Sequence, residues 1–326
     1  MNPPRVLFLG RTTLDATYCI DRLPAEDTKV YASHFHAAPG GPALNAAITH
    51  SLLGGKSLLI SAVGSGPWSI PVRAALERHR ISLLDLAANT AYETPLTTVL
   101  VNSASASRTI VNPPIDNEWV PLIPRIWGSG KTQTSDDVSP QQSLPTDWSP
   151  LPQVLLTDGF HLAETLPFLA ACRNAGSALC LDGGSWKPGT EELAPLLTAA
   201  ICSERFAVPG QSATSCDALF DWFSSRGVPC IALTRGPRPI LCWERGRRFQ
   251  IEIAQINVAD TLGAGDVLHG AFAYFFVSGH DFEPALRRAA QIATLSCQST
   301  GVESWTGHAL AAAYDPALKQ SHPGTH

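Results

Sequence analysis

The segment Asp260–Gly270, with the sequence DTLGAGDVLHG, combines small residues and carboxylates in a way that could do chemistry. A glycine-rich turn here leads into an apolar helix predicted over Asp266–Ser278. The backbone N–H groups of Gly263, Ala264 and Gly265 could then point into one space, next to the unpaired N–H groups and positive dipole end of the helix. Such a turn binds anions, and small residues leave room for a phosphate.

Asp266 stands beside this predicted anion hole. A carboxylate at that position could act as a general base that takes a proton from an attacking hydroxyl group. It could equally cap the helix, because aspartate is a favoured N-cap residue. Taken alone, the turn is also what a capped, buried helix would show, so a second motif is needed to choose between these readings.

That second motif is Gly40–Asn45, GGPALN, which also precedes a predicted helix. Gly40 and Gly41 would allow the backbone to approach a ligand closely. Asn45 offers a donor and an acceptor, and Asp15 follows the first predicted strand. Together these groups suit the vicinal hydroxyls of a sugar, because each hydroxyl both donates and accepts a hydrogen bond. Singly, each is also typical of a turn or of the polar face of a helix.

The segments around these motifs alternate between short apolar runs and helical patterns. Such runs are typical of strands covered on both faces, and the repetition predicts a parallel sheet with right-handed crossovers. Ligands bind at the carboxyl ends of strands in such sheets, where we expect the site. The predicted strands are Val6–Gly10, Leu58–Gly64, Val154–Asp158, Ala178–Asp182 and Cys230–Thr234. The predicted helices between them are Ala43–Leu53, Ile70–His79, Leu162–Ala175, Glu191–Ala200 and Ser212–Arg226.

Two regions break this rhythm, residues 15–38 and residues 95–113, and we expect them to form a small β-sheet lid over the edge of the large sheet. The second region contains a predicted hairpin over Thr97–Asn112. His34 and His36 would share one face of a strand. A metal-binding pair is one interpretation of these histidines, and ordinary polar residues of the lid are the favoured one.

Residues 125–150 are rich in Gly, Ser, Gln and Pro and are expected to form a long, exposed, flexible loop. Within it, Gly128–Thr132 (GSGKT) is similar to the end of a phosphate-binding P-loop, but Arg125 occupies the place of the first glycine and no strand precedes it. We therefore interpret it as linker. The chain, residues 1–326, is expected to form a single domain.

Composition excludes several classes of protein. The chain has 326 residues, of which 44% are hydrophobic and 16% charged, so it can bury a sizeable core. With a net charge of −5, the chain lacks the basic surface that attracts nucleic acids or anionic membranes. The sequence shows neither a signal-peptide core nor a spanning apolar stretch, and its eight cysteines form no CxxC pair. We expect a cytoplasmic protein with reduced cysteines.

GGPALN and DTLGAGDVLHGAF, in this order and spacing, resemble the two signatures of the ribokinase-like (PfkB) carbohydrate kinase family, over Arg5–Leu310. The resemblance implies a three-layer α/β/α fold, doubly wound around a mostly parallel sheet, with a small β-sheet lid. It implies ATP-dependent phosphorylation of a primary hydroxyl of a small free sugar, with Mg²⁺ and, in the family, a monovalent cation. The resemblance implies a homodimer that forms through the lid. It implies no nucleic-acid partner and no membrane partner.

Carried onto this sequence, the resemblance makes Asp266 the catalytic base beside the anion hole of Gly263, Ala264 and Gly265. Ser107–Val111 (SRTIV) is similar to the lid of ketohexokinases, so its arginine would reach a phosphate. The implied substrate-binding residues are Asp15, Gly40, Gly41, Asn45 and Arg108. The implied nucleotide-site residues are Thr234, Gly236, Asp260, Thr261, Ala293 and Cys297.

The sequence departs from the family at two places. Many members have an N-x-x-E motif that organises Mg²⁺, whereas we place the equivalent stretch at Ala207–Ser215, which has neither residue in register. No protein ligand is therefore assigned to Mg²⁺, which would rest on nucleotide phosphates and water. The turn Thr234–Pro239 has Arg238 or Pro239 where a second glycine is usual, which leaves the nucleotide donor open.

Two alternatives to the sugar kinase remain. A nucleoside kinase of the same family would need an apolar or aromatic slot for a base, and the lid segments contain Tyr18, Tyr31 and Phe35. A catalytically silent protein that binds sugar or nucleotide would retain the fold, and the two departures favour it slightly. The presence of Asp266 with all three small residues of the anion hole argues against a silent protein.

Overall fold

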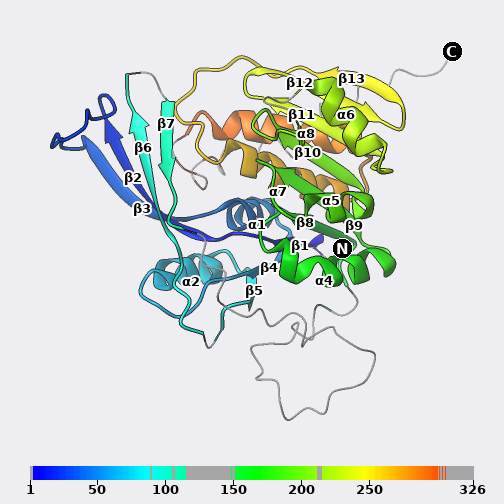
Figure 1. Ribbon diagram of the computed structural model, residues 1–326, viewed down its shortest axis with the longest axis horizontal. Coiled ribbons are helices and arrows are strands. Elements are labelled where there is room, and N and C mark those ends of the chain that lie inside the picture. Colours follow the sequence, from blue (N-terminus) through cyan, green and yellow to red (C-terminus); the bar gives the residue numbers. More distant parts are fainter. Residues whose placement is uncertain are drawn as a thin grey trace, which may run out of the picture.

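The computed structural model describes residues 3–88, 90–104, 107–114, 148, 151–210, 215–299, 301, 303 and 305. These residues form a large sheet of nine strands and a separate sheet of four (Figure 1). The large sheet has the order β13-β12-β11-β10-β9-β8-β1-β4-β5. Its strands are β1 (Arg5–Leu9), β4 (Lys56–Ser61), β5 (Ser82–Asp85), β8 (Val154–Thr157), β9 (Ala178–Gly183), β10 (Ala199–Ser203), β11 (Cys230–Arg235), β12 (Arg238–Glu244) and β13 (Arg247–Ile251).

The large sheet is doubly wound, as expected. The run β11-β10-β9-β8-β1-β4-β5 pairs in parallel, and β12 and β13 add an antiparallel edge. From β1 the chain moves to β4 and β5 on one side and later returns to β8, β9, β10 and β11 on the other. The strand order therefore reverses between β1 and β8, and the crevice beyond the carboxyl ends at such a point is where ligands bind.

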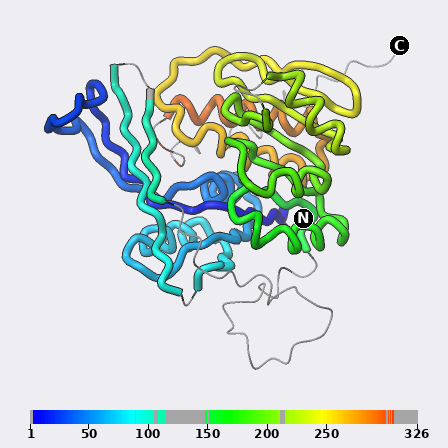
Figure 2. Tube along the Cα trace, in the orientation of Figure 1, coloured from blue at the N-terminus to red at the C-terminus, as the bar shows by residue number. Residues whose placement is uncertain are grey.

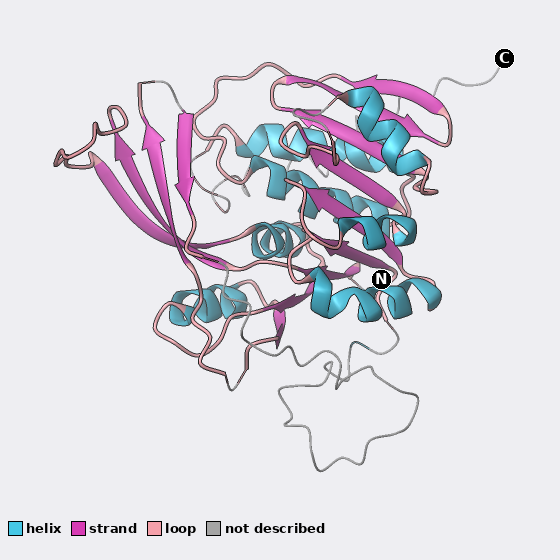
Figure 3. Cartoon of the chain, in the orientation of Figure 1, coloured by secondary structure: helices cyan, strands magenta, loops and turns pink. Residues whose placement is uncertain are grey.

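Helices cover both faces of the large sheet, which gives three layers (Figure 3). The alternate residues of β1 point to opposite faces, so Val6 and Phe8 join one core while Leu7 and Leu9 join the other. The first core is closed by α1 (Pro42–Leu52), α2 (Ser69–Arg78), α7 (Ala264–Val277) and α8 (Phe282–Ser296). The second is closed by α4 (Leu162–Asn174), α5 (Thr190–Leu193), the 3₁₀ turn Ala194–Leu196 and α6 (Cys216–Ser224).

The four-stranded sheet projects from one side of this body, with both of its chain segments drawn in blue to cyan (Figure 2). Its order is β3-β2-β6-β7, formed by β2 (Thr13–Ile20), β3 (His34–Gly40), β6 (Leu96–Asn102) and β7 (Ser107–Val111). The small sheet expected beside the large one is thus present. We call these four strands the lid sheet.

Some sequence-based predictions differ from the structure. The helix expected over Glu191–Ala200 ends early, because Ala199–Ser203 forms the buried central strand β10. Burial on both faces of the sheet overrides the helical propensity of its alanines there. GSGKT and the loop over residues 125–150 lie outside the described residues, apart from Trp148. Trp148 is 1% exposed, so at this residue the expected exposed loop is buried.

Candidate active site

Helices α1 and α7 bring the two glycine motifs together. A Cβ on Gly270 would lie 2.3 Å from the carbonyl oxygen of Ala46, so glycine is needed where the two helices cross. Gly41, with φ of 96°, precedes α1, and Pro42 opens its first turn. Gly263, with φ of 74°, precedes α7. The close crossing places the first turns of both helices at the same end of the large sheet.

At this crossing Asn45 contacts Asp266. The Nδ2 group of Asn45 donates a hydrogen bond of 2.7 Å to Oδ2 of Asp266. Desolvation in the cleft and the nearby charge of Asp182 raise the pKa of Asp266 to about 7, against the opposing hydrogen bond from Asn45. A carboxylate whose pKa lies near neutral pH can both accept and release a proton under physiological conditions.

The turn before α7 forms a cradle of backbone groups. The N–H of Ala264 bonds to the carbonyl oxygen of Thr261 at 3.3 Å, so one of the three expected donors is engaged within the turn. The described residues provide no acceptor for the N–H groups of Gly263 and Gly265. A Cβ on Gly265 would meet no atom within 4 Å. The cradle is therefore open at Gly265, beside Asp266, at the positive end of the helix dipole.

A cavity of about 1150 Å³ lies between this cradle and the lid sheet. Single small ligands occupy pockets of about 300–1,000 Å³, so this volume has room for two ligands. Residues of both motifs and of the lid sheet line it. The predicted site residues among them are Asp15, Gly41, Asn45, Arg108, Thr234, Gly236, Gly263, Gly265 and Asp266.

One end of the cavity is rich in hydroxyl and carboxylate groups. Thr13, Asp15 and Thr17 alternate along β2 and face the cavity. The hydroxyl of Thr13 donates to Oδ1 of Asp15 at 2.7 Å, and burial raises the pKa of Asp15. Gly40 leaves space for this carboxylate, because a Cβ there would fall 2.1 Å from its Oδ2 atom. Gly40 thus shapes the site without lining it.

Two buried polar atoms at this end have no partner among the described residues. They are Oδ1 of Asn45 and Oγ1 of Thr17. Their residues are 7% and 3% exposed, and both line the cavity. Buried polar atoms are nearly always hydrogen-bonded in folded proteins. A ligand with several hydroxyl groups would satisfy both.

Arginines close the other side of the cradle. Arg108 of β7 reaches across the cavity and donates from Nη1 to Oγ1 of Thr261 at 3.2 Å. Burial lowers the pKa of Arg108, and the neighbouring charge of Arg205 lowers it further. Both guanidinium groups line the cavity. Two cations that share a cleft with free backbone N–H groups suit a polyphosphate.

The remaining nucleotide-site candidates lie around this side. Gly236, with φ of 62°, forms the β11–β12 turn, and Arg238 pairs there with Glu204, which follows β10. Asp260 accepts backbone N–H groups from Leu262 and Gly301, so its carboxylate ties the signature turn together. Ala293 and Cys297 do not line the cavity. The carbonyl oxygen of Cys297 accepts the N–H groups of Ala259 and Asp260, so this residue stabilises the segment before the turn without lining the cavity.

Sequence analysis missed several polar residues of the cavity. Asp182, the penultimate residue of β9, lines the cavity near Asp266, and Arg205 follows β10. Asp182 had a signal, since it ends a predicted strand. Arg205 had none, because the strand before it was not predicted and its first two residues had been assigned to a helix. Asp158 does not line the cavity, but it accepts N–H groups from Arg11 and Phe160, and burial raises its pKa to about 6.

The aromatic side chains of the two lid segments lie away from the cavity. Tyr18 and Phe35 alternate with the cavity-lining residues and contact each other on the outer face, with ring centroids 4.8 Å apart and ring planes tilted by 42°. Tyr31 is 99% exposed. The aromatic slot that a nucleoside base would need is therefore not built by these residues in this chain. His34 and His36 do share the cavity face, with ring centroids 5.9 Å apart.

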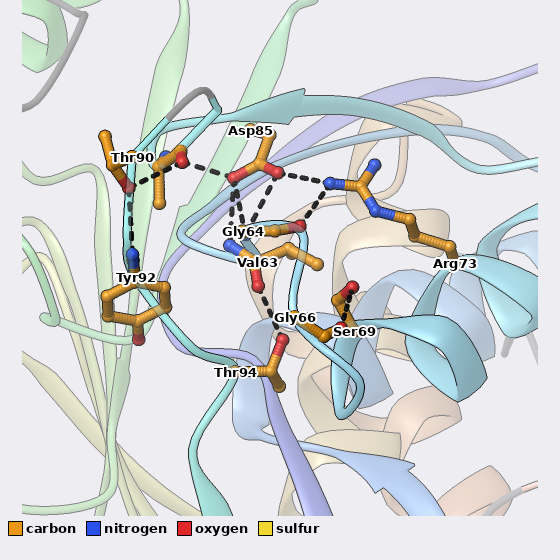
Figure 4. Close-up of polar contacts among 10 residues, drawn as sticks. Val63, Gly64, Gly66, Ser69, Arg73, Asp85, Thr90, Tyr92 and Thr94 are labelled. Carbon is orange, nitrogen blue, oxygen red and sulfur yellow. Dashed lines mark hydrogen bonds and ion pairs between the residues drawn. The ribbon is translucent and has the colours of Figure 1, made fainter.

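Helix α2 lines a further part of the cavity, and Asp85 anchors the loop that leads into it. Figure 4 shows this carboxylate at the centre of a polar network. It accepts the N–H groups of Val63, Gly64 and Ala87 and pairs with Arg73 at 2.6 Å. All the bonding capacity of Asp85 is used inside the protein, so we interpret it as structural.

No metal cage is evident. Among the described residues, no three His, Cys, Asp or Glu side chains gather where they could hold an ion. No chemical step below depends on a protein-bound Mg²⁺. A search of the same residues for a helix able to cross a lipid bilayer also found none.

Comparison with known proteins identifies relatives along nearly the whole chain. Residues 4–122 and 153–306 match the model of the pfkB family carbohydrate kinases. The ribokinase of Bacillus subtilis (strain 168) is 23% identical over 309 residues, which cover 91% of this chain and 94% of the relative. The deoxyribokinase of Salmonella typhi is 21% identical over 313 residues, covering 92% and 94%.

Solved structures share the fold. The ribokinase of Thermotoga maritima superposes with a TM-score of 0.73 and 19% identity, covering 93% of this chain and 96% of that one. The ribokinase of Arabidopsis thaliana, solved with ribose and ATP, has a TM-score of 0.70 and 21% identity, covering 92% and 94%.

Proposed function

Because this chain belongs to the pfkB family of carbohydrate kinases, we propose that it transfers the γ-phosphoryl group of ATP to the primary hydroxyl of a small sugar. The family makes it a phosphotransferase with an alcohol acceptor, either a sugar or a nucleoside kinase. The observation that carries the finer proposal is the position of Asp266. Its carboxylate directly follows the open cradle at Gly265 and accepts the hydrogen bond of Asn45, whose Oδ1 atom has no partner among the described residues.

In the proposed reaction the sugar lies against Asp15 and Asn45, and its primary hydroxyl faces Asp266. Asp266 takes the hydroxyl proton as the oxygen attacks the γ-phosphorus of ATP. The new P–O bond forms while the bond to the β-phosphate oxygen breaks, so ADP leaves and the proton remains on the Asp266 carboxyl group. The proton then passes to solvent, which restores the base.

The charge of the transferring phosphoryl group is met by groups of this chain. The free N–H groups of Gly263 and Gly265 and the end of α7 face it, and Arg108 and Arg205 flank the phosphates. Arg108 also joins the lid sheet to the signature turn, so it can hold the lid over bound ligands. Exclusion of water by such closure suppresses hydrolysis of ATP. Mg²⁺ is proposed to arrive on the nucleotide phosphates, with water as its remaining ligands.

An acceptor panel tests the proposal. We would measure ADP release with Mg²⁺ and ATP in the presence of ribose, fructose, 2-keto-3-deoxygluconate, fructose 6-phosphate or adenosine. The proposal expects turnover with at least one free sugar above both fructose 6-phosphate and adenosine. It also expects Asp266→Asn to lower turnover by about 10²–10⁴ while titration calorimetry still detects Mg²⁺–ATP. Near wild-type turnover by Asp266→Asn would refute the assigned base.

The same measurements address the alternatives. Turnover with adenosine alone would favour a nucleoside kinase, for which the outward Tyr18 and Phe35 offer no slot in the cavity of this chain. A catalytically silent protein would bind sugar without Mg²⁺-dependent binding of ATP. The open cradle and the near-neutral pKa of Asp266, which burial raises to about 7, favour an active enzyme.

We also propose that two copies associate through the outer face of the lid sheet. Apolar side chains gather there, since Tyr18, Phe35 and Val111 are 38%, 52% and 56% exposed. Light scattering would find a dimer for the wild-type chain. The double substitution Tyr18→Lys and Phe35→Lys is expected to give a monomer of normal fold, and an unchanged mass would contradict the assignment of this face.

A further inference from the structure

One buried histidine of α7 faces an acceptor at each ring nitrogen. The His269 residue is 5% exposed. Its Nδ1 atom lies 2.7 Å from the carbonyl oxygen of Gly265 and 3.4 Å from Oδ2 of Asp182. Its Nε2 atom lies 3.1 Å from the carbonyl oxygen of Ile201 on β10. Backbone carbonyl oxygens only accept hydrogen bonds, so both ring nitrogens must donate.

Only the doubly protonated ring meets this requirement. A neutral imidazole carries a single N–H, and its other nitrogen would turn a lone pair toward a carbonyl oxygen. Such a contact is unfavourable inside a protein, where no water can intervene. The imidazolium satisfies both carbonyl groups and also places a positive charge beside Asp182. The geometry of the ring thus indicates its charge.

His50 on the neighbouring helix α1 provides the contrast. It is fully buried, its Nδ1 atom lies 2.8 Å from Oγ of Ser57, and its Nε2 atom has no partner among the described residues. Burial lowers the pKa of His50 to about 3, so this ring is neutral. Two buried histidines on helices that cross therefore differ in the number of acceptors around them.

We propose that His269 is a buried imidazolium that positions Asp182 and keeps Asp266 in the ionised form needed to accept the substrate proton. The second half of this statement rests on the proposed function, because it takes Asp266 as the base. The first half concerns only the protonation of the ring. His269 is thus a positioning residue, which acts through the carboxylates and through the Gly265 carbonyl at the cradle.

The surrounding charges fix the direction of the effect. The charge of Asp182 raises the pKa of Asp266, whereas the charge of His269 lowers it. Without the imidazolium, the carboxylates at the cleft would repel one another, and Asp266 would retain its proton to a higher pH. Among the described residues, the other titratable or charged groups that interact with this cluster are Asp15 on β2, Arg108 on β7, Asp158 after β8, Cys202 on β10 and Lys187 after β9.

A ¹H–¹⁵N NMR experiment on the full chain tests the protonation of the ring. With ¹⁵N-labelled histidine at pH 7.5, the inference expects directly bonded protons on both ring nitrogens of His269. His50 serves as the internal control, with a proton on one nitrogen only. Signals are assigned by their loss in His269→Asn and His50→Gln. A bare ring nitrogen on His269 at this pH would overturn the inference, whatever the activity of the enzyme.

The pH profile of kcat tests the effect on Asp266. His269→Asn should move the acid limb to higher pH by about one unit, which is a tenfold loss of turnover well below the limb. Asp182→Asn should move it to lower pH, because a negative charge is removed. His50→Gln should leave it in place. Opposite shifts cannot arise from a general loss of structure.

Each of the two tests can contradict its own half of the proposal without the other. If both ring nitrogens are protonated but neither substitution moves the acid limb, the link to Asp266 is refuted. If the assay finds no acceptor at all, the proposed function fails while the NMR result still decides the charge of His269. Where His269→Asn does not fold, as judged by circular dichroism, His269→Gln replaces it in both experiments.

Discussion

Asn45 and Asp266, 221 residues apart in sequence, are joined by a hydrogen bond of 2.7 Å from Nδ2 to Oδ2. The bond connects the first turn of α1 to the first turn of α7, and so one glycine motif to the other. It also orients one carboxylate oxygen, which leaves Oδ1 of Asp266 for the proton of an acceptor. The oxygen of that amide side chain, Oδ1 of Asn45, has no hydrogen-bond partner among the described residues.

Two substitutions of Asn45 should give graded effects on the acid limb of the kcat–pH profile. The hydrogen bond from Asn45 lowers the pKa of Asp266, so Asn45→Leu should raise that pKa and move the limb to higher pH. Asn45→Asp, nearly the same shape, adds a like charge and should move the limb further in the same direction. Equal profiles for all three proteins would show that this contact does not tune the base.

Asp266→Asn should make the protein more stable while it removes activity. The pKa of Asp266 is raised from 3.8 to about 7 in the folded protein, chiefly by desolvation. Its stabilising effect is therefore complete below pH 3.8 and is lost as the pH rises through about 7. At pH 8 the folded protein holds a costly buried charge, and its removal should raise the melting temperature by a few degrees.

The gain in melting temperature from Asp266→Asn should shrink as the pH falls toward 4, where wild type is protonated too. Asp85→Asn is the matched control, since that carboxylate accepts three backbone N–H groups and pairs with Arg73 (Figure 4). The control should melt at lower temperature, because the NH₂ group of the new amide is a donor that would face these N–H donors without accepting from them. Thermal melts of both variants at pH 4.5, 6 and 8 check this, and a loss of stability in Asp266→Asn at pH 8 would contradict the argument.

Arg108→Gln should weaken the binding of ATP more than that of the sugar. Arg108 bonds to Thr261 across the cavity and lies beside Arg205, on the phosphate side of Asp266. Loss of a charge-assisted hydrogen bond of about 1.5–3 kcal/mol should raise the KM for ATP by about tenfold to a hundredfold. Arg22, exposed beyond the end of β2, is the control, and Arg22→Gln should leave both KM values unchanged. A larger rise in the KM for the sugar would place Arg108 at the acceptor.

Sequence analysis predicted what depends on local patterns. The strand–helix alternation and the two glycine motifs carry their own signals, so the doubly wound sheet and the turns at Gly41 and Gly263 could be found. Strand β10 could not, because its alanines resemble helix and only the pairing with β9 and β11 makes it a strand. Arg205, which follows that strand, was missed with it.

The direction of side chains was the second feature that could not be predicted from the sequence. Tyr18 and Asp15 lie three residues apart on one strand and therefore face opposite sides, but their register against β3 and β6 decides which side is the cavity. The charge of His269 depends on carbonyl oxygens of Gly265 and Ile201, which belong to the backbone and have no sequence signal.

Gly265→Ala should separate stability from activity most clearly. A Cβ at Gly265 would meet no protein atom within 4 Å, and this glycine lies in the first turn of α7 without a positive φ. Alanine is favoured over glycine in helices by up to about 1 kcal/mol, so the variant should be as stable as wild type or slightly more stable. The added methyl group would nevertheless occupy the space proposed for the transferring phosphoryl group. We expect turnover to fall by at least tenfold.

Gly270→Ala, on the same helix, is the matched control for Gly265→Ala. Its Cβ would lie 2.3 Å from the carbonyl oxygen of Ala46, so α1 and α7 would have to separate. Stability and activity should therefore fall together, since the contact between Asn45 and Asp266 depends on that crossing. Melting temperature and initial rates of the two variants give the comparison. If Gly265→Ala kept full activity, the open space beside Asp266 would not be the position of a phosphate, and the assigned geometry of transfer would be wrong.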